Sequence, residues 1–313
     1  MDNNIIKFEA NIEQAININS FIDKFIASQD IRPSSRDTYR KSLKQFAVWV
    51  SDRPINTLTR EDILEYKDFI KAKKLSSYTL SSYLVSVRKF FEWTESLKIY
   101  PNIARGVKGG KQNRQFKKDP LTISQIKNLL ESIDRKTAKG KRDFSILNLL
   151  IRTGIRTIEI IRADMQDIRQ ESGEAVLWIQ GKGADDKDNF VMLTEDTLRP
   201  IKEYLSTRKN AKENDPLFTS LSNRNQVERL TTKSISRIVK TDLRGIGLNG
   251  GRLTAHSLRH TAITLSLMAG ASIQEAQALA RHKDVNTTLI YSHNLNRIAN
   301  APEKKIEVLL ADI

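Results

Sequence analysis

Apolar residues recur at helical spacing through most of the chain. Four segments between residues 13 and 98 carry them three and four positions apart, which is typical of amphipathic helices. Start signals accompany this spacing: Pro33 precedes the second segment, Thr59 the third, and Ser76 or Ser77 opens the fourth. The first third of the chain is therefore predicted to be a bundle made of helices alone.

The rest of the chain is predicted to be mostly helical with one small sheet. Helical spacing returns in five segments: 122–133, 144–152, 195–209, 232–244 and 254–269. Residues 174–180 and 189–193 alternate as strands do, and residues 181–188 form the turn of a hairpin between them. The expected fold class is mainly α, with an N-terminal helical bundle and a C-terminal mixed α/β domain containing a small antiparallel sheet.

Residues 101–119 interrupt the helical pattern. They contain three glycines, one proline and a cluster of basic residues against a single acid. Such a composition is typical of a linker between domains. We therefore expect a first domain at 1–100, a basic linker at 101–119 and a second domain at 120–313.

Positive charge is the strongest compositional feature. The 52 Lys and Arg exceed the 37 Asp and Glu, which gives a formal net charge of +15. Charge of this size favours polyanionic partners, of which nucleic acid is the commonest. The chain has no cysteine, so disulfides and cysteine-based catalytic or metal sites are excluded. No signal peptide and no apolar stretch of about 20 residues is evident, which predicts a cytoplasmic, nucleoid-associated protein with no membrane partner.

Side chains capable of chemistry concentrate between residues 254 and 291. His256, Arg259 and His260 stand at i, i+3 and i+4 of a predicted helix and so share one face. Apolar residues fall on the opposite face and are expected in the core: Leu258, Ala262, Leu265 and Ala269. The helix is therefore predicted to be amphipathic, with a working side of His and Arg.

His282 and Tyr291 are nine residues apart, which on a continuous helix would point them to opposite sides. Residues 283–286 are a plausible break followed by a new helix start, with Asn286 as its candidate cap. Such a break would return both side chains to the same pocket.

These residue types suit the transfer of a phosphodiester. Two guanidinium groups can hold the non-bridging oxygens, a tyrosine can attack the phosphorus, and histidine or lysine can protonate the leaving oxygen. Arg156, just after Thr153 and Gly154, could supply a second arginine, and Lys182 on a Gly-flanked hairpin could supply the lysine. His256 and His260 have the spacing of a zinc pair, but the Glu that the metalloprotease motif needs next to its first His is absent, so no metal is expected.

Four segments resemble the catalytic boxes of the tyrosine recombinases, the phage-integrase and Xer family, in order and spacing. They are TGIRTIEI (153–160), IQGKG (179–183), HSLRH (256–260) and ARHKDVNTTLIY (280–291). Residues 13–98 are similar in length and helical content to the family's core-binding, SAM-like domain. The resemblance implies a site-specific recombinase that cleaves and rejoins DNA through a 3′-phosphotyrosine intermediate and a Holliday junction, without metal, ATP or another cofactor.

The resemblance also implies roles for individual residues. Arg156 and Arg259 would bind the scissile phosphate, and Tyr291 would be the nucleophile. Lys182 would protonate the departing 5′ hydroxyl.

Four further residues would support this reaction. His256 would act in proton transfer, and His282 would support the phosphate and the nucleophile. Glu159 would order the site without touching the substrate, and His260 is expected to hydrogen-bond within the core.

The sequence departs from the family's pattern at two places. Ala280 and Arg281 precede His282 where the family more usually has Leu-Gly. The hairpin after Lys182 is acidic, with Asp185, Asp186 and Asp188, where relatives tend to be shorter and basic.

The family's partners are double-stranded DNA with inverted-repeat core sites and three further copies of the chain. The resemblance thus implies a homotetramer on DNA in which neighbours exchange a C-terminal helix, here residues 303–311, with accessory DNA-bending or directionality proteins as further candidates. Two alternative functions fit the same residues. A type IB topoisomerase would use the same cleavage chemistry as a recombinase, and a DNA-binding regulator that has lost catalysis would bind DNA in the same way. The short stretch before residue 13 favours an Xer-like architecture, but the sequence does not separate integrase from resolvase or chromosome-dimer partner.

Overall fold

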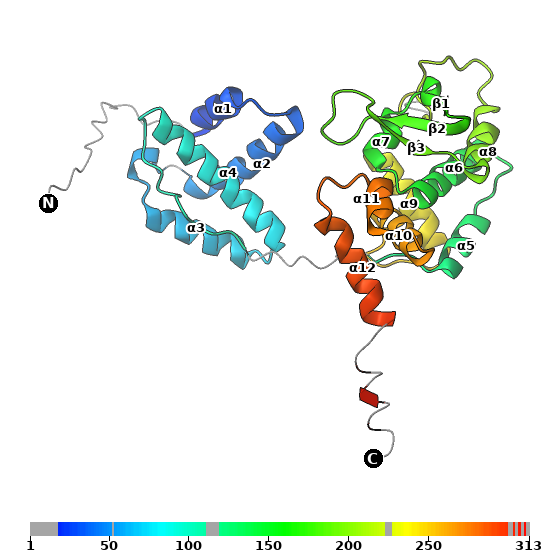
Figure 1. Ribbon diagram of the computed structural model, residues 1–313. Coiled ribbons are helices and arrows are strands. Elements are labelled where there is room, and N and C mark those ends of the chain that lie inside the picture. Colours follow the sequence, from blue (N-terminus) through cyan, green and yellow to red (C-terminus); the bar gives the residue numbers. More distant parts are fainter. Residues whose placement is uncertain are drawn as a thin grey trace. The chain divides into compact units, whose positions relative to one another are not determined.

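The chain divides into two units, Met1–Arg114 and Gln115–Ile313 (Figure 1). The computed structural model describes residues 18–51, 53–110, 119–222 and 227–299, together with 303, 306, 307 and 310. The mainly α architecture with a small antiparallel sheet is confirmed.

The first unit is built from helices: α1 (Ile18–Ser28), α2 (Pro33–Val50), the 3₁₀ turn η1 (Ile55–Thr57), α3 (Arg60–Ala72) and α4 (Ser77–Ser96). The predicted caps are confirmed. Thr59 and Asp62 form a reciprocal capping box at the start of α3, and the Ser76 hydroxyl accepts the backbone N–H of Thr79 at 3.1 Å. Each cap gives a partner to N–H groups that the first helical turn leaves unpaired.

Aromatic rings fill the core of the first unit. Phe46 is fully buried and meets Tyr66 and Phe91 edge-to-face, at centroid distances of 5.0 and 6.0 Å. Phe25 meets Phe90 in the same way at 5.8 Å. Rings in this geometry contribute beyond the area that they bury, so aromatic contacts join the four helices within a core that also contains many Ile and Leu side chains.

The first part of the predicted linker belongs to this core. Ala104 and Val107 are buried with the aromatic residues, and the Tyr100 hydroxyl donates to the carbonyl of Leu58 at 2.6 Å. Two apolar residues three positions apart are too few to give a visible period in a segment rich in Gly and Lys. Residues 111–118 of the predicted linker lie outside the described residues.

The second unit holds the remaining elements. Its helices are α5 (Ile123–Glu131), α6 (Ala138–Thr153), α7 (Thr157–Arg162), the 3₁₀ turn η2 (Met165–Asp167), α8 (Glu195–Leu205), α9 (Thr232–Gly245), α10 (Ala255–Met268), α11 (Ile273–Ala280) and α12 (Asn286–Ala299). Its strands are β1 (Ile168–Glu171), β2 (Glu174–Ile179) and β3 (Asn189–Met192). In Figure 1 the sheet lies at the top of this unit and α12 at its lower end.

The strands form an antiparallel sheet in the order β1-β2-β3. The predicted hairpin of β2 and β3 is confirmed, with Val176 opposite Met192 and Ile179 opposite Asn189. Strand β1 is absent from the sequence prediction, because its four residues, Ile-Arg-Gln-Glu, are too short and too polar to show alternation.

Helix α10 differs from the prediction. A polar working side is predicted for it, yet Arg259 is 2% exposed and His260 is 6% exposed, and both are buried like Leu258 on the other face. Ala269, expected in the core, is exposed. The reason is that α10 packs against α6, α9, α11 and α12 at once, so neighbouring helices cover Arg259 and His260, while His256 in the first turn stays exposed.

Within the described residues, no helix is long and apolar enough to cross a membrane.

The aromatic core of the first unit gives a stability prediction. Phe46→Ala removes a fully buried ring and leaves a cavity, so we expect it to lower the free energy of unfolding by about 3–5 kcal/mol. Phe69→Ala, at a ring that is 40% exposed, is the matched control and should cost about 1 kcal/mol or less. Denaturant unfolding of the full chain, followed by tryptophan fluorescence, measures both. Equal losses would contradict this description of the core.

Candidate active site

The site begins where α6 ends. Gly154 closes α6 in the left-handed conformation (φ +59°), and a Cβ there would lie 3.3 Å from the Cβ of Ala262. The chain then turns directly into α7, whose N-cap is Arg156. A glycine suits this turn, because left-handed backbone carries little penalty without a side chain. Residue 156 is thereby placed beside the first turn of α10.

Arg156 is held by Glu159. Its backbone N–H donates to Oε2 of Glu159 at 2.8 Å, and its guanidinium donates to Oε1 at 2.7 Å. Glu159 is fully buried. Burial opposes its charge, but the guanidinium groups of Arg281 and Arg156 outweigh burial and lower the pKa of this carboxyl. Glu159 is therefore a buried carboxylate that serves as counterion to arginine.

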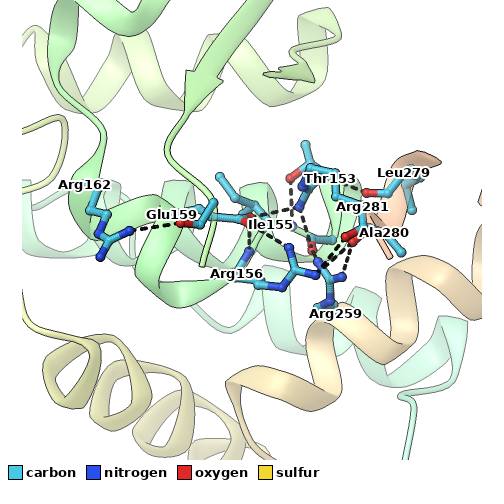
Figure 2. Close-up of polar contacts among 11 residues, drawn as sticks. Thr153, Ile155, Arg156, Glu159, Arg162, Arg259, Leu279, Ala280 and Arg281 are labelled. Atoms are coloured by element: carbon cyan, nitrogen blue, oxygen red, sulfur yellow. Dashed lines mark hydrogen bonds and ion pairs between the residues drawn. The ribbon is translucent and has the colours of Figure 1, made fainter. Parts of the chain in front are cut away.

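Arg259 reaches the same place from α10. Its guanidinium donates to the carbonyl of Gly154 at 2.6 Å and to the carbonyl of Ala280, which also accepts from Arg156 at 3.3 Å (Figure 2). Burial, and then the charges of Arg156 and Arg281, lower the pKa of Arg259 to about 9, so it stays protonated at neutral pH. The two arginines are thus brought together from segments about 100 residues apart.

Arg156 and Arg259 line a cavity of about 410 Å³ together with Lys182 and His256. Lys182 and His256 are exposed, one on the hairpin after β2 and the other in the first turn of α10. Four of the predicted site residues thus face one solvent-accessible space. Such a cluster of fixed cations is suited to a phosphate group.

The hairpin that carries Lys182 is anchored at both ends. Arg162 donates to the carbonyl of Gly181 at 3.0 Å, and Lys187 pairs with Asp164 and Asp167 at 2.7 and 2.5 Å. Burial opposes the charge of Lys187, but hydrogen bonds to both aspartates raise its pKa. Lys187 is not predicted from the sequence, because a lysine in a polar turn carries no pattern. The acidic residues of the hairpin, Asp185, Asp186 and Asp188, are exposed.

Tyr291 lies in α12 and is shielded. Its side chain is 4% exposed and packs against Ile263 and Ala280. The tyrosine Oη lies 2.6 Å from Nδ1 of His260. Burial raises the pKa of Tyr291, although Arg259 and Arg156 act in the opposite direction. His260, expected from sequence to bond within the core, is therefore the hydrogen-bond partner of the tyrosine.

The chain break between His282 and Tyr291 is confirmed, and it brings the two rings to a stacked arrangement with centroids 6.3 Å apart. The predicted cap is wrong. Asn286 is the first residue of α12, and the carboxylate of Asp284 accepts its backbone N–H at 2.9 Å. An aspartate two residues earlier satisfies the helix start in the same way.

The buried histidines are neutral. Burial, and then His256 and Arg259, lower the pKa of His260 to about 3. Burial and the nearby arginines lower the pKa of His282 to about 4, and its Nδ1 lies 2.9 Å from the Thr288 hydroxyl. The positive charge of the site thus resides on Arg and Lys. Among the residues that the structure describes, no three His, Asp or Glu side chains gather as metal ligands would.

The low pKa of His260 predicts a pH dependence of stability. The unfolded histidine has a pKa of about 6.5, so below that pH the unfolded chain binds a proton that the folded chain refuses until about pH 3. Stability is therefore lost as the pH falls from 6.5 towards 3, by about 2 kcal/mol at pH 5 for one such histidine. We expect His260→Gln to lose less stability than the wild type between pH 7.5 and pH 5. Denaturant unfolding at both pH values measures this, with exposed His293→Gln as control. An unchanged pH dependence in His260→Gln would contradict a neutral buried His260.

Two family models match the chain. The model described as "Phage integrase family" covers residues 120–297, more than half of the chain. The model described as "Phage integrase, N-terminal SAM-like domain" covers residues 18–97.

Curated relatives match over most of the chain. A tyrosine recombinase of Synechococcus elongatus is 28% identical over 272 residues, which cover 83% of this chain and 84% of the relative. The tyrosine recombinase XerD of Listeria innocua is 27% identical over 286 residues, covering 88% and 93%.

Among solved structures, the XerH site-specific recombinase in a post-cleavage complex with palindromic difH substrate shares the fold with a TM-score of 0.72. It has 22% identity and covers 91% of this chain and 85% of that chain. A lambda integrase dimer bound to a COC′ core site gives a TM-score of 0.66 at 16% identity, covering 88% and 77%. Together with the family models, these matches show that the chain belongs to the phage integrase family, the tyrosine recombinases.

Proposed function

We propose that the protein is a site-specific DNA recombinase that cuts and rejoins DNA strands through a phosphotyrosine bond to Tyr291. The observation that carries this proposal is the convergence of Arg156, Arg259, Lys182 and His256 on one cavity. The cavity combines fixed positive charge with groups that can move protons, next to a buried tyrosine. These are the requirements of phosphodiester transfer.

In this proposal the scissile phosphate enters the cavity and accepts hydrogen bonds from Arg156 and Arg259. Each guanidinium has five N–H donors, and only some of them are used by the protein carbonyls and Glu159. The remaining donors would bind the non-bridging oxygens. They are charged before the substrate arrives, so they stabilise the negative transition state without reorganisation.

The Tyr291 oxygen would attack phosphorus and form the phosphotyrosine bond, while the bond to the 5′ oxygen breaks. His260 Nδ1 lies 2.6 Å from the Tyr291 oxygen and would accept the phenol proton in the tautomer that carries its hydrogen on Nε2, and Lys182 or His256 would give a proton to the leaving oxygen. Since Tyr291 is almost fully shielded here, attack also requires α12 to shift when DNA is bound.

A basic face on α9 would hold the duplex. Lys233, Arg237, Lys240 and Arg244 recur at intervals of four, three and four residues, and they line a groove of about 370 Å³. Ser236 belongs both to this groove and to the catalytic cavity, so the basic face adjoins the chemistry. Lysine and arginine along one helix face, mixed with Ser and Thr, suit contacts to the phosphate backbone.

The proposed partners are double-stranded DNA with inverted-repeat core sites and three further copies of the chain. Relatives provide support, since XerH is seen on a palindromic difH substrate and lambda integrase as a dimer on a core site. Residues 303–311, the segment proposed to be exchanged between neighbours, lie mostly outside the described residues. Of those described, Ile306 and Leu310 are one turn apart and each more than half exposed, which leaves apolar surface for a neighbouring copy to cover. Accessory DNA-bending proteins and action at the nucleoid remain part of the proposal.

The nucleophile can be tested by trapping. With a nicked suicide DNA that carries the cognate site, the wild type should accumulate a covalent protein–DNA adduct, because the cleaved end diffuses away. Tyr291→Phe should form none while its DNA affinity stays within about twofold, since the hydroxyl serves the chemistry. Exposed Tyr78→Phe is the control and should retain the adduct. Denaturing gels and a binding titration measure both properties. An adduct in Tyr291→Phe would exclude this nucleophile, and binding without any adduct in the wild type would favour a silent regulator.

The α9 face predicts a change in salt dependence. Arg237→Ala should weaken DNA binding and reduce the slope of log K against log salt concentration by about 0.9, the contribution of one phosphate contact. Arg199→Ala removes an exposed arginine from α8 that lines neither the α9 groove nor the catalytic cavity, so it should leave the slope unchanged. Fluorescence anisotropy between 50 and 300 mM salt measures the slopes. Equal slopes for the wild type and Arg237→Ala would remove α9 from the DNA interface.

A further inference from the structure

Arg281 ends α11 in an unusual conformation. Its backbone lies in the left-handed region (φ +51°, ψ +48°), where a residue with a Cβ costs about 1–2 kcal/mol. Its side chain is only 10% exposed. A strained residue of this kind persists where its surroundings hold it, and such residues cluster at functional sites.

Three acceptors hold the Arg281 guanidinium. It donates to Oε2 of Glu159 at 3.0 Å, to the carbonyl of Leu279 at 2.7 Å and to the carbonyl of Gly154 at 3.3 Å. Two of these acceptors lie more than 120 residues earlier in the chain. Arg281 therefore ties the end of α11 to the turn between α6 and α7.

The same acceptors also hold the two arginines proposed to bind phosphate (Figure 2). Glu159 accepts from Arg156, and the carbonyl of Gly154 accepts from Arg259. In return, the backbone carbonyl of Arg281 accepts from Arg156 at 3.1 Å. Arg156 and Arg281 thus share the carboxylate of Glu159, and Arg259 shares a backbone carbonyl with each of them. A shift of one guanidinium group therefore changes the bonds of the others.

We propose that Arg281 is a positioning residue for DNA strand cleavage: it fixes Glu159 and the adjoining carbonyls so that Arg156 and Arg259 face the scissile phosphate. The inference rests on the proposed function. Arg281 acts through these partners instead of through the substrate, because both of its terminal guanidinium nitrogens donate to protein acceptors, its Nε is buried, and its side chain is almost covered.

The central test replaces Arg281 by glycine in the full-length protein. Glycine adopts the left-handed backbone without strain, so Arg281→Gly removes the side-chain bonds and leaves the turn favourable. With the nicked substrate at saturating concentration, single-turnover cleavage should fall at least tenfold. DNA affinity should stay within about twofold, and the salt slope of binding should not change.

Two controls separate geometry from charge. Lys98→Gly removes a positive charge at another left-handed position (φ +54°), on the exposed end of α4, and should cleave as the wild type does. Arg281→Lys keeps the charge, but an ammonium group cannot bridge Glu159 and two carbonyls as the planar guanidinium does. It should therefore cleave nearly as slowly as Arg281→Gly.

A double-mutant cycle tests the route through Glu159. If Arg281 acts through this carboxylate, Arg281→Gly combined with Glu159→Gln should cleave no more slowly than the slower of the two single variants. A merely structural role would lower the thermal midpoint and the DNA affinity together with cleavage, which would overturn the inference.

Other results would overturn it as well. If the fold-losses in cleavage rate of Arg281→Gly and Glu159→Gln multiply in the double variant, Arg281 and Glu159 act separately. A salt slope lowered by about 0.9 would mean that Arg281 itself contacts a phosphate. Wild-type cleavage in Arg281→Gly, with a normal adduct in the wild type, would sink this inference and leave the recombinase proposal standing. No adduct in the wild type would instead sink the recombinase proposal, and this inference with it.

Discussion

The buried carboxylate of Glu159 is the contact on which the site depends. Arg156 and Arg281 form ion pairs with it, and Arg259 lies close by. Burial first, and then the charges of neighbouring arginines, lower the pKa of Arg259 and of Arg281. Without an anion among them, burial of these cations would be strongly unfavourable. One carboxylate leaves an excess of positive charge, which a bound phosphodiester would reduce. The excess positive charge thus lies where the proposed phosphate would bind, and hydrogen bonds to backbone carbonyls hold the guanidinium groups in its absence.

Much of the architecture could be predicted from local chemistry. The capping box of Thr59, the left-handed end of α6 at Gly154 and the hairpin of β2 and β3 are encoded by residues close in sequence. The candidate site residues could be proposed because four short segments keep the order and spacing of a known family. Each of these signals depends on residue type at a fixed spacing, which a sequence displays directly.

The remaining features depend on what packs from a distance. Periodicity gave α10 a polar side, but it could not show that α12 covers that side and joins Tyr291 to His260. Arg281 was visible as a departure from the family, yet its bond to Glu159 joins residues 122 positions apart. Ala104 and Val107 entered a core from a segment with a linker's composition. In each case the deciding contact lies in tertiary structure, which no local pattern contains.

The most direct test of this account is a crystal structure of the full chain joined to a nicked DNA site through Tyr291. We predict that Arg156 and Arg259 contact the non-bridging oxygens of the phosphotyrosine, while Arg281 keeps its bond to Glu159 and stays off the DNA. A structure in which Arg281 binds the phosphate, or in which Glu159 has separated from both Arg156 and Arg281, would contradict the claim that this buried carboxylate organises the site.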